Sequence, residues 1–234
     1  MVGWNRKIGV MEIKNILFDL DGTITDPKVG ITESIQYALS KLKFSRIPEP
    51  DDLVWCIGPP LHESFSILLK TENKDAINEA VRQYRVNYNR QGIYQFKLYD
   101  GIIDTIKTLK NEKNNIFVAT SKPRIMAEKI FEYLFLSDLF DGIYGSELDG
   151  IRTRKGELIS FLLEKEKILH KKVIMIGDRK HDIIGAKDNS ILSCGVCYGY
   201  GCEEELNEAG ADYLVNKPEE IIDLIEYIKN ASYQ

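Results

Sequence analysis

Several features that define special classes of protein are absent or scarce in this chain of 234 residues. No apolar run reaches the roughly 20 residues that a membrane-spanning helix needs, and the amino terminus lacks the apolar core of a signal peptide. The four cysteines lie at scattered positions, a pattern typical of reduced thiols. Internal repeats and low-complexity segments are also missing. We therefore expect a cytoplasmic globular protein without a membrane partner.

Positive charge is in short supply as well. Lysine and arginine together number 31 against 36 aspartate and glutamate residues, so the net charge is −5. A protein that binds the nucleic acid backbone needs the opposite balance, and no nucleic acid partner is expected. The hydrophobic content of 44% and the charged content of 29% are ordinary for a globular protein. The length suits one large α/β domain, or a core with a smaller insertion.

The most informative segment is residues 15–26. Its apolar run at 16–18 predicts a buried strand, and this strand ends at Asp19 and Asp21. Alternate residues of an extended chain point the same way, so the two carboxylates can converge at the edge where open α/β sheets bind ligands. Carboxylates held so close need a proton or a cation to compensate their charge. A hard divalent cation with oxygen ligands is the natural partner.

Hydrophobic periodicity along the rest of the chain predicts strands that alternate with helices. Further strands are expected at Ile116–Ala119, Val173–Ile176, Ile191–Cys197 and Tyr213–Val215. Helices are expected at Ile31–Leu42, Leu61–Leu69, Ala76–Tyr88, Ile102–Leu109, Pro123 to about Leu134, Leu158–Ile168, Ile183–Lys187 and Glu219–Lys229. This alternation predicts a doubly wound parallel sheet. Residues 27–96 contain only helices and are interpreted as an insertion after the first strand. The leader Met1 to Met11 is assigned no function.

Polar residues stand at the ends of two other predicted strands. Thr120 and Ser121 follow one strand, where a hydroxyl group and the amides of a helix start can donate to an anion. Asp178 follows another strand, with Asp182 four residues later, and Gly177 permits close backbone approach. Between these segments, a basic cluster opens a helix. Its Lys155 could supply the cation that a phosphoryl oxygen needs.

These positions resemble, in order, the four motifs of the haloacid dehalogenase (HAD) superfamily: Asp19-Leu20-Asp21-Gly22-Thr23, then Thr120, then Lys155, then Gly177-Asp178 with Asp182. The resemblance spans nearly the whole chain. Segments 176–186 and 198–201 are similar to the phosphoglycolate phosphatase-like branch, as is a helical insertion after the first motif. The resemblance implies a Rossmann-like α/β core of residues 1–26 and 97–234, with a small α-helical cap of residues 27–96.

The same resemblance implies a magnesium-dependent phosphatase that hydrolyses small phosphomonoesters through an aspartyl-phosphate intermediate. Asp19 would be the nucleophile, and Asp21 the general acid and then the general base. Superfamily dehalogenases lack an acid at the position of Asp21. Mg²⁺ would be held by the Asp19 carboxylate, the Asp21 backbone carbonyl and Asp178, with Asp182 in support.

Phosphate binding is implied for Thr120, Ser121 and Lys155. Thr120 is favoured over Ser121, which could compete for its role. Other basic residues have open roles. Lys122, Arg152 and Arg154 are rivals for the role of Lys155, and Arg179, Lys180 and His181, which follow Asp178, could reach substrate or lie in a solvated loop. Without the first motif, Asp178 and Asp182 would be interpreted as helix caps. Cys194 and Cys197 have metal-like spacing, but their apolar strand favours buried thiols.

The expected partner is a small phosphorylated metabolite, either phosphoglycolate or a nucleoside 5′-monophosphate, and the expected assembly is a monomer or a weak homodimer. A rigid turn at a helix start, containing Gly58, Pro59 and Leu61, could face the active site and set specificity. Two alternatives use the same scaffold. One is a sugar-phosphate mutase of the β-phosphoglucomutase type, and the other is a non-catalytic phosphometabolite-binding protein.

Overall fold

The computed structural model describes residues 13–231, so the leader Met1 to Met11 lies outside the described residues. The chain forms two compact units. The sheet unit comprises the described residues up to Ile24 and from Leu98 onward, and the helical unit is Thr25–Lys97. No helix in residues 13–231 combines the length and apolar character needed to cross a bilayer.

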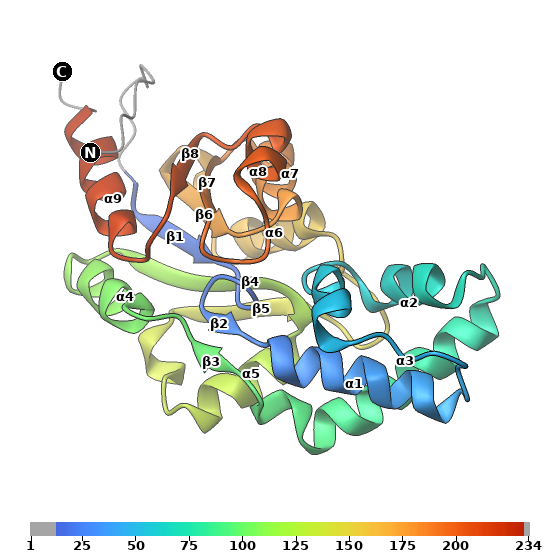
Figure 1. The fold of residues 1–234 in the computed structure, drawn as a ribbon. Helices are drawn as coiled ribbons and strands as arrows, with labels where there is room; N and C mark the ends of the chain where they lie inside the picture. Colours follow the sequence, from blue (N-terminus) through green and yellow to red (C-terminus); the bar gives the residue numbers. More distant parts are fainter. Residues whose placement is uncertain (1–12, 232–234) are drawn as a thin grey trace. The chain divides into compact units, whose positions relative to one another are not determined.

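A six-stranded parallel sheet lies at the centre of the sheet unit (Figure 1). Its strand order is β5-β4-β1-β6-β7-β8. The strands are β1 (Asn15–Phe18), β4 (Asn115–Pro123), β5 (Gly142–Ser146), β6 (Val173–Gly177), β7 (Leu192–Val196) and β8 (Tyr213–Val215). The predicted parallel α/β fold is thus confirmed, with strands added on both sides of β1.

Helices cover both faces of this sheet (Figure 1). They are α4 (Ile102–Asn111), α5 (Arg124–Tyr133), α6 (Lys155–Lys165), α7 (Lys180–Asp188), α8 (Glu203–Ala209) and α9 (Glu220–Ala231), with 3-10 turns η3 (Ser137–Leu139) and η4 (His170–Lys172). Helix α6 contacts α7 and α7 contacts α8 on one face, while α4 contacts α9 on the other. This doubly wound arrangement follows from right-handed crossovers that run outward from β1 in both directions.

Apolar residues on both sides of the strands explain why the sheet is buried between helices. Leu17 lies beside Phe117 and Met175 in the sheet, and all three pack with Leu158 and Leu162 of α6. The alternate residues of β1 are also fully buried, on the opposite face. A central parallel strand is therefore apolar along its whole length, as the sequence indicated.

Two differences from the predicted elements concern β4 and its neighbour. Strand β5 was missed because its sequence, Gly-Ile-Tyr-Gly-Ser, has little apolar character and forms the edge of the sheet. Pro123 was expected in the first turn of a helix, and this was wrong. It ends β4 in an extended conformation (φ −53°, ψ 130°), and α5 begins at Arg124.

Helices α6 and α7 each begin three residues earlier than predicted, at Lys155 and Lys180.

The helical unit has its own core. Its elements are β2 (Thr25–Asp26), α1 (Lys28–Lys41), η1 (Pro50–Cys56), α2 (Leu61–Leu69), α3 (Lys74–Arg90), η2 (Gly92–Tyr94) and β3, Lys97–Leu98, whose last residue belongs to the sheet unit. Asn73 caps α3 by accepting hydrogen bonds from the amides of Asp75 and Ala76. Phe65 of α2 meets Tyr84 of α3 edge to face, at 6.3 Å between ring centroids. The expected helices at 31–42, 61–69 and 76–88 are therefore present.

Candidate functional site

The carboxyl ends of three adjacent strands, β4, β1 and β6, define the candidate site. Asp19 follows β1 directly, and its amide still donates to the Ile176 carbonyl of β6 at 2.9 Å. Asp178 follows β6, and Thr120 lies near the end of β4. The connections from β1 and β6 run in opposite directions along the sheet, and open α/β sheets bind their ligands at such a switch point. Asp19, Asp178 and Thr120 therefore lie at the same edge of the sheet.

Three buried carboxylates form the centre of the site. Asp19, Asp178 and Asp182 each offer an oxygen atom, and these oxygens lie within 4.8 Å of one another. Burial, together with the charges of Asp182 and Asp19, raises the pKa of Asp178 well above its ordinary value. Burial also raises the pKa of Asp182, although Lys155 opposes that shift. The surrounding groups therefore do not fully stabilise the negative charge of these three carboxylates.

Lys155, the first residue of α6, is the cation that partly balances this cluster. Its ammonium lies 2.9 Å from Asp19 Oδ1 and 2.7 Å from Asp182 Oδ1, and it donates to the Ala119 carbonyl at 2.9 Å. Burial lowers the pKa of Lys155, but the two aspartates outweigh that effect and hold it above its ordinary value. Lys155 thus contacts Asp19 and Asp182 directly.

A fourth carboxylate, Asp21, is paired with a different lysine. Lys122 Nζ lies 2.6 Å from Asp21 Oδ2, and both side chains are largely buried. Burial raises the pKa of Asp21, while Lys122 acts in the opposite direction. The sequence had suggested Lys122 only as a rival to Lys155. The sequence feature that could have indicated this role is Pro123, because a residue that precedes proline favours an extended conformation over a helix.

Thr120 and Ser121 differ in what they contact. The Thr120 hydroxyl is buried and accepts a hydrogen bond from the Lys122 amide at 3.2 Å. Ser121 is half-buried, and its carbonyl accepts from the Ser146 hydroxyl at 2.8 Å. Both residues lie in the last part of β4, at the edge of the sheet where the three carboxylates also lie. Thr120 thus helps to shape the end of β4, and Ser121 fastens it to β5.

Glycine residues make room for Asp178. A Cβ atom at Gly22 would fall 2.1 Å from Asp178 Oδ2, and one at Gly199 would fall 2.3 Å from Asp178 Cβ. The Tyr200 amide donates to Asp178 Oδ2 at 2.8 Å. This backbone contact has no side-chain signature in the sequence, although the flanking glycines Gly199 and Gly201 indicate a close approach of the chain. Two loops, one after β1 and one after β7, therefore enclose this carboxylate.

The donor set suits Mg²⁺. Asp178 Oδ1 is buried and, among the described residues, has no hydrogen-bond partner, so it has a lone pair available for a cation. Asp19 offers further carboxylate oxygen at the same place. Asp182 is already engaged, since its oxygens contact Lys155 and the Arg179 amide. Hard oxygen donors of this kind match the preference of Mg²⁺. Because the oxygens of Asp182 already contact Lys155 and the Arg179 amide, Asp182 suits a supporting role.

The residues between Asp178 and Asp182 have separate surroundings. Arg179 Nε donates to Glu205 Oε1 of α8 at 2.9 Å, and the Lys180 amide donates to the same oxygen at 2.9 Å. The pKa of Glu205 is lowered because these two partners outweigh the effect of its burial. The Lys180 side chain is exposed. Arg179 is therefore tied to α8, which fixes the loop that carries Asp178.

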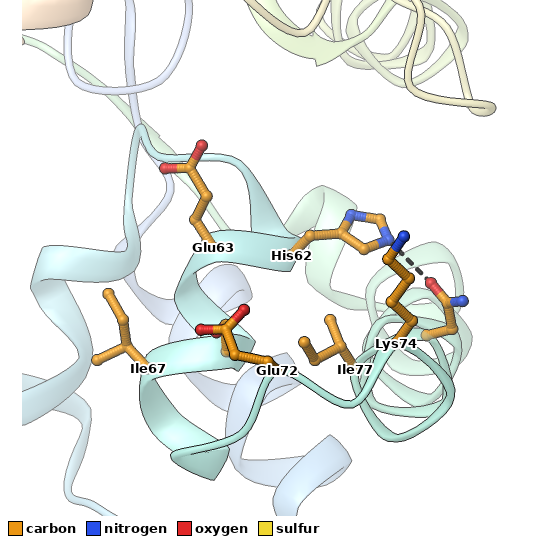
Figure 2. A pocket seen from close by; sticks show the side chains of 8 residues that line it. His62, Glu63, Ile67, Glu72, Lys74 and Ile77 are labelled. Carbon is orange, nitrogen blue, oxygen red and sulfur yellow. Dashed lines mark hydrogen bonds between the residues drawn. The ribbon is translucent and has the colours of Figure 1, made fainter.

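The helical unit contains a hollow of its own, about 620 Å³ in volume, beside α2 and the start of α3 (Figure 2). His62 Nε2 lies 3.2 Å from Asn78 Oδ1 within it. The lining mixes acidic, basic and apolar side chains: His62, Glu63, Ser66, Ile67, Glu72, Lys74, Ile77 and Asn78. Gly58, Pro59 and Leu61 lie at the amino-terminal side of α2, where Gly58 adopts a φ of +104°. These three residues are half-buried.

Comparison with known proteins agrees with this geometry. Residues 16–196 match the family model of the haloacid dehalogenase-like hydrolases. The chain belongs to this family. It is 45% identical to a 5′-nucleotidase of Pseudomonas aeruginosa over 82% of this chain and 86% of that protein. The crystal structure of a predicted phosphatase from Clostridium acetobutylicum is 39% identical, with a TM-score of 0.86 over 94% of this chain and all of that one.

A relative named for a different activity is also similar. The tyrosine-protein kinase PtkA of Mycobacterium tuberculosis is 33% identical over 80% of this chain. The match covers 62% of PtkA, so that protein extends well beyond the shared region. The family and its hydrolase scaffold are therefore established, and the choice of substrate and acceptor needs a separate argument.

Proposed function

We propose that this protein is a magnesium-dependent phosphatase that hydrolyses small phosphomonoesters through an aspartyl-phosphate on Asp19. The observation that carries the proposal is the contact of Lys155 with Asp19 beside the buried carboxylate of Asp178. A nucleophilic carboxylate, a fixed cation and a site for a divalent ion are the parts that phosphoryl transfer requires.

The carboxylates of Asp19 and Asp178 and the backbone carbonyl of Asp21 would hold Mg²⁺. Bound there, the ion supplies positive charge that offsets the carboxylates and the oxygens of the transferred phosphoryl group. Asp182 would support the site by keeping Lys155 in place. The charge balance of the cluster supports this assignment, because Lys155 contacts Asp19 and Asp182 while the pKa of Asp178 stays raised well above its ordinary value.

The chemistry proceeds in two displacements. In the first, an Asp19 carboxylate oxygen forms a bond to phosphorus, the bond to the alcohol oxygen breaks, and Asp21 donates its proton to that oxygen. In the second, water gives a proton to the Asp21 carboxylate and attacks phosphorus, so that the bond to Asp19 breaks. Inorganic phosphate leaves, and both aspartates return to their starting state.

The remaining phosphoryl oxygens would be held by Thr120, Ser121 and Lys155. Such contacts contribute mainly by positioning the group and by neutralising its charge. Lys155 suits this role because its ammonium already lies at the nucleophile. The partner is a small phosphorylated metabolite, and we expect a cytoplasmic monomer or weak homodimer.

Of the two substrate classes, nucleoside 5′-monophosphates are favoured over phosphoglycolate. The support is the 45% identity to a protein named 5′-nucleotidase over most of both chains. The segment of Gly58, Pro59 and Leu61 would contribute to this choice. The likeness to PtkA favours a second candidate, the transfer of a phosphoryl group to an acceptor other than water.

The test is phosphate release from nucleoside 5′-monophosphates, phosphoglycolate and p-nitrophenyl phosphate, with Mg²⁺ or with a chelator. We expect Mg²⁺-dependent release by the wild type and none by Asp19→Asn. Asp104→Asn, a matched change at an exposed residue of α4, should keep full activity. Transfer from ATP to an added tyrosine peptide without phosphate release would favour the second candidate. Full activity after thorough chelation would refute the magnesium requirement.

A further inference from the structure

The ion pair between Lys122 and Asp21 is not used by the mechanism proposed above. Lys122 Nζ lies 2.6 Å from Asp21 Oδ2, and only 6% of the lysine side chain is exposed. Lysine is almost never buried unless its charge is paired. The pair therefore fixes one oxygen of Asp21 in space, because moving it would leave the ammonium buried without its counter-charge.

An irregularity of β4 sets the direction of Lys122. In the pairing of β4 with β5, Thr120 lies opposite Gly145 and Pro123 lies opposite Ser146. Ser121 and Lys122 are thus two extra residues on β4, which form a bulge. Bulges re-aim side chains, and they are frequent beside active sites.

Three contacts hold this bulge. The Lys122 amide donates to the Thr120 hydroxyl at 3.2 Å, and the Ser146 hydroxyl donates to the Ser121 carbonyl at 2.8 Å. Gly145 packs directly beneath it. A Cβ atom at position 145 would fall 2.5 Å from the Lys122 carbonyl oxygen and 2.7 Å from the Arg124 amide nitrogen. Backbone atoms cannot yield as a flexible side chain would, so the bulge needs glycine at this position.

We propose that Lys122 is a positioning residue for Asp21, aimed by the bulge of β4. This inference rests on the proposed function, in which Asp21 protonates the leaving alcohol oxygen. Lys122 keeps its own proton in both displacements. Its ammonium donates a hydrogen bond to Asp21 Oδ2 while Oδ1 carries the proton to be delivered, and it becomes the counter-charge of the carboxylate once that proton has left. The side chain of Asp21 is thereby held in the orientation that delivers the proton as the bond between phosphorus and the alcohol oxygen breaks.

The consequence is a selective dependence on the leaving group. Alkyl phosphates need protonation of a basic alkoxide, whereas p-nitrophenolate is stable enough to leave without it. The informative constant is kcat/KM, which reports the steps up to departure of the alcohol. With Mg²⁺ saturating, Lys122→Met should lower kcat/KM for an alkyl phosphate by about 10²-fold, as loss of a positioned acid does. For p-nitrophenyl phosphate the loss should be less than about tenfold.

Two further measurements separate positioning from other roles. The inhibition constant of inorganic phosphate should stay the same in Lys122→Met, because the lysine is assigned to Asp21 and not to phosphate. Lys122→Arg, which keeps the charge, should recover part of the rate with the alkyl ester. Lys129→Met serves as the matched control, since Lys129 is exposed on α5, and it should leave all constants unchanged.

The second variant, Gly145→Ala, tests the bulge without touching the ion pair. It should show the same selectivity, with a greater loss for the alkyl ester than for p-nitrophenyl phosphate. Equal losses for all esters in both variants, or weaker phosphate inhibition in Lys122→Met, would overturn the role of Lys122. That result leaves the phosphatase proposal intact. A wild type without any phosphomonoester turnover overturns both.

Discussion

Gly22 lies so close to Asp178 that a Cβ atom at position 22 would fall 2.1 Å from the carboxylate oxygen Oδ2. The backbone of Gly22 also has a φ of +87°, a region that favours glycine. The backbone of the loop after β1 therefore packs directly against the side chain of Asp178 from the loop after β6, with no room for a side chain at position 22. The first prediction follows from this contact.

Gly22→Ala should weaken Mg²⁺ binding by at least about tenfold, because the added methyl group displaces Asp178, and 1.4 kcal/mol is enough for that factor. The measurement is a calorimetric Mg²⁺ titration. Gly150→Ala is a matched control, since Gly150 has a φ of +94° but open space around its Cβ position. Backbone strain of roughly 1–3 kcal/mol is common to both variants. Equal Mg²⁺ affinities in the two would show that the contact with Asp178 is unimportant.

Lys155→Met should lower the free energy of unfolding by about 3–5 kcal/mol, the usual cost of removing one partner from a buried ion pair. The reason is that Asp19 and Asp182 would lose the ammonium that lies within 3 Å of each. Urea denaturation in the presence of a chelator measures this effect. Lys171→Met, at an exposed lysine, should change stability by less than about 0.5 kcal/mol.

A second substitution checks that electrostatics causes this loss. Adding Asp182→Asn to Lys155→Met removes one of the carboxylates that repel one another, so the double variant should be more stable than Lys155→Met alone. A double variant that is less stable by the full sum of the two single effects would contradict this explanation. The loss would then come from packing alone.

Mg²⁺ should stabilise the protein more at pH 8 than at pH 5. In the metal-free protein the pKa of Asp178 lies well above 3.8, mainly because of burial. A folded carboxyl group with a raised pKa binds its proton more tightly than the unfolded chain does. Stability is therefore lost as pH rises from about 4 through the folded pKa. A bound cation removes this loss by stabilising the carboxylate.

Thermal unfolding with Mg²⁺ or with a chelator, at both pH values, measures the difference. At a concentration 100 times Kd, a ligand specific for the folded state adds about 2.7 kcal/mol. Asp178→Asn should abolish most of the Mg²⁺ response and raise the metal-free Tm at pH 8. The same rise in Tm with Mg²⁺ at pH 5 and pH 8 would count against this account.

Leu61→Ala should change the ranking of substrates more than the rate with p-nitrophenyl phosphate. Leu61 begins α2 directly after the turn of Gly58 and Pro59, which is our candidate for the specificity segment. Steady-state kinetics with nucleoside 5′-monophosphates and phosphoglycolate measure the ranking. Ile67→Ala is the control from the same helix, since Ile67 is 61% exposed. Equal losses for all substrates in Leu61→Ala would refute the specificity role.

The amino-acid sequence determined the class of fold and the position of the acidic residues. Its apolar runs were sufficient for five of the six strands of the sheet, because a central parallel strand must be apolar on both faces. The ends of those runs placed Asp19 and Asp178 at one edge, since parallel strands share their carboxyl ends. Local periodicity failed for β5, an edge strand whose short apolar pair, Ile143 and Tyr144, stands between glycines and whose pairing with β4 decides its conformation.

Only the tertiary structure decided which lysine pairs with which aspartate. Lys155 and Lys122 both lie near the motifs in the sequence, yet Lys155 reaches Asp19 from α6 while Lys122 reaches Asp21 from a bulge in β4. A bulge depends on the register of two strands, and the close fit at Gly145 depends on β5 lying against β4. Charge pairing acts over a few ångströms between segments far apart in the chain. Periodicity along one segment carries no information about such distances.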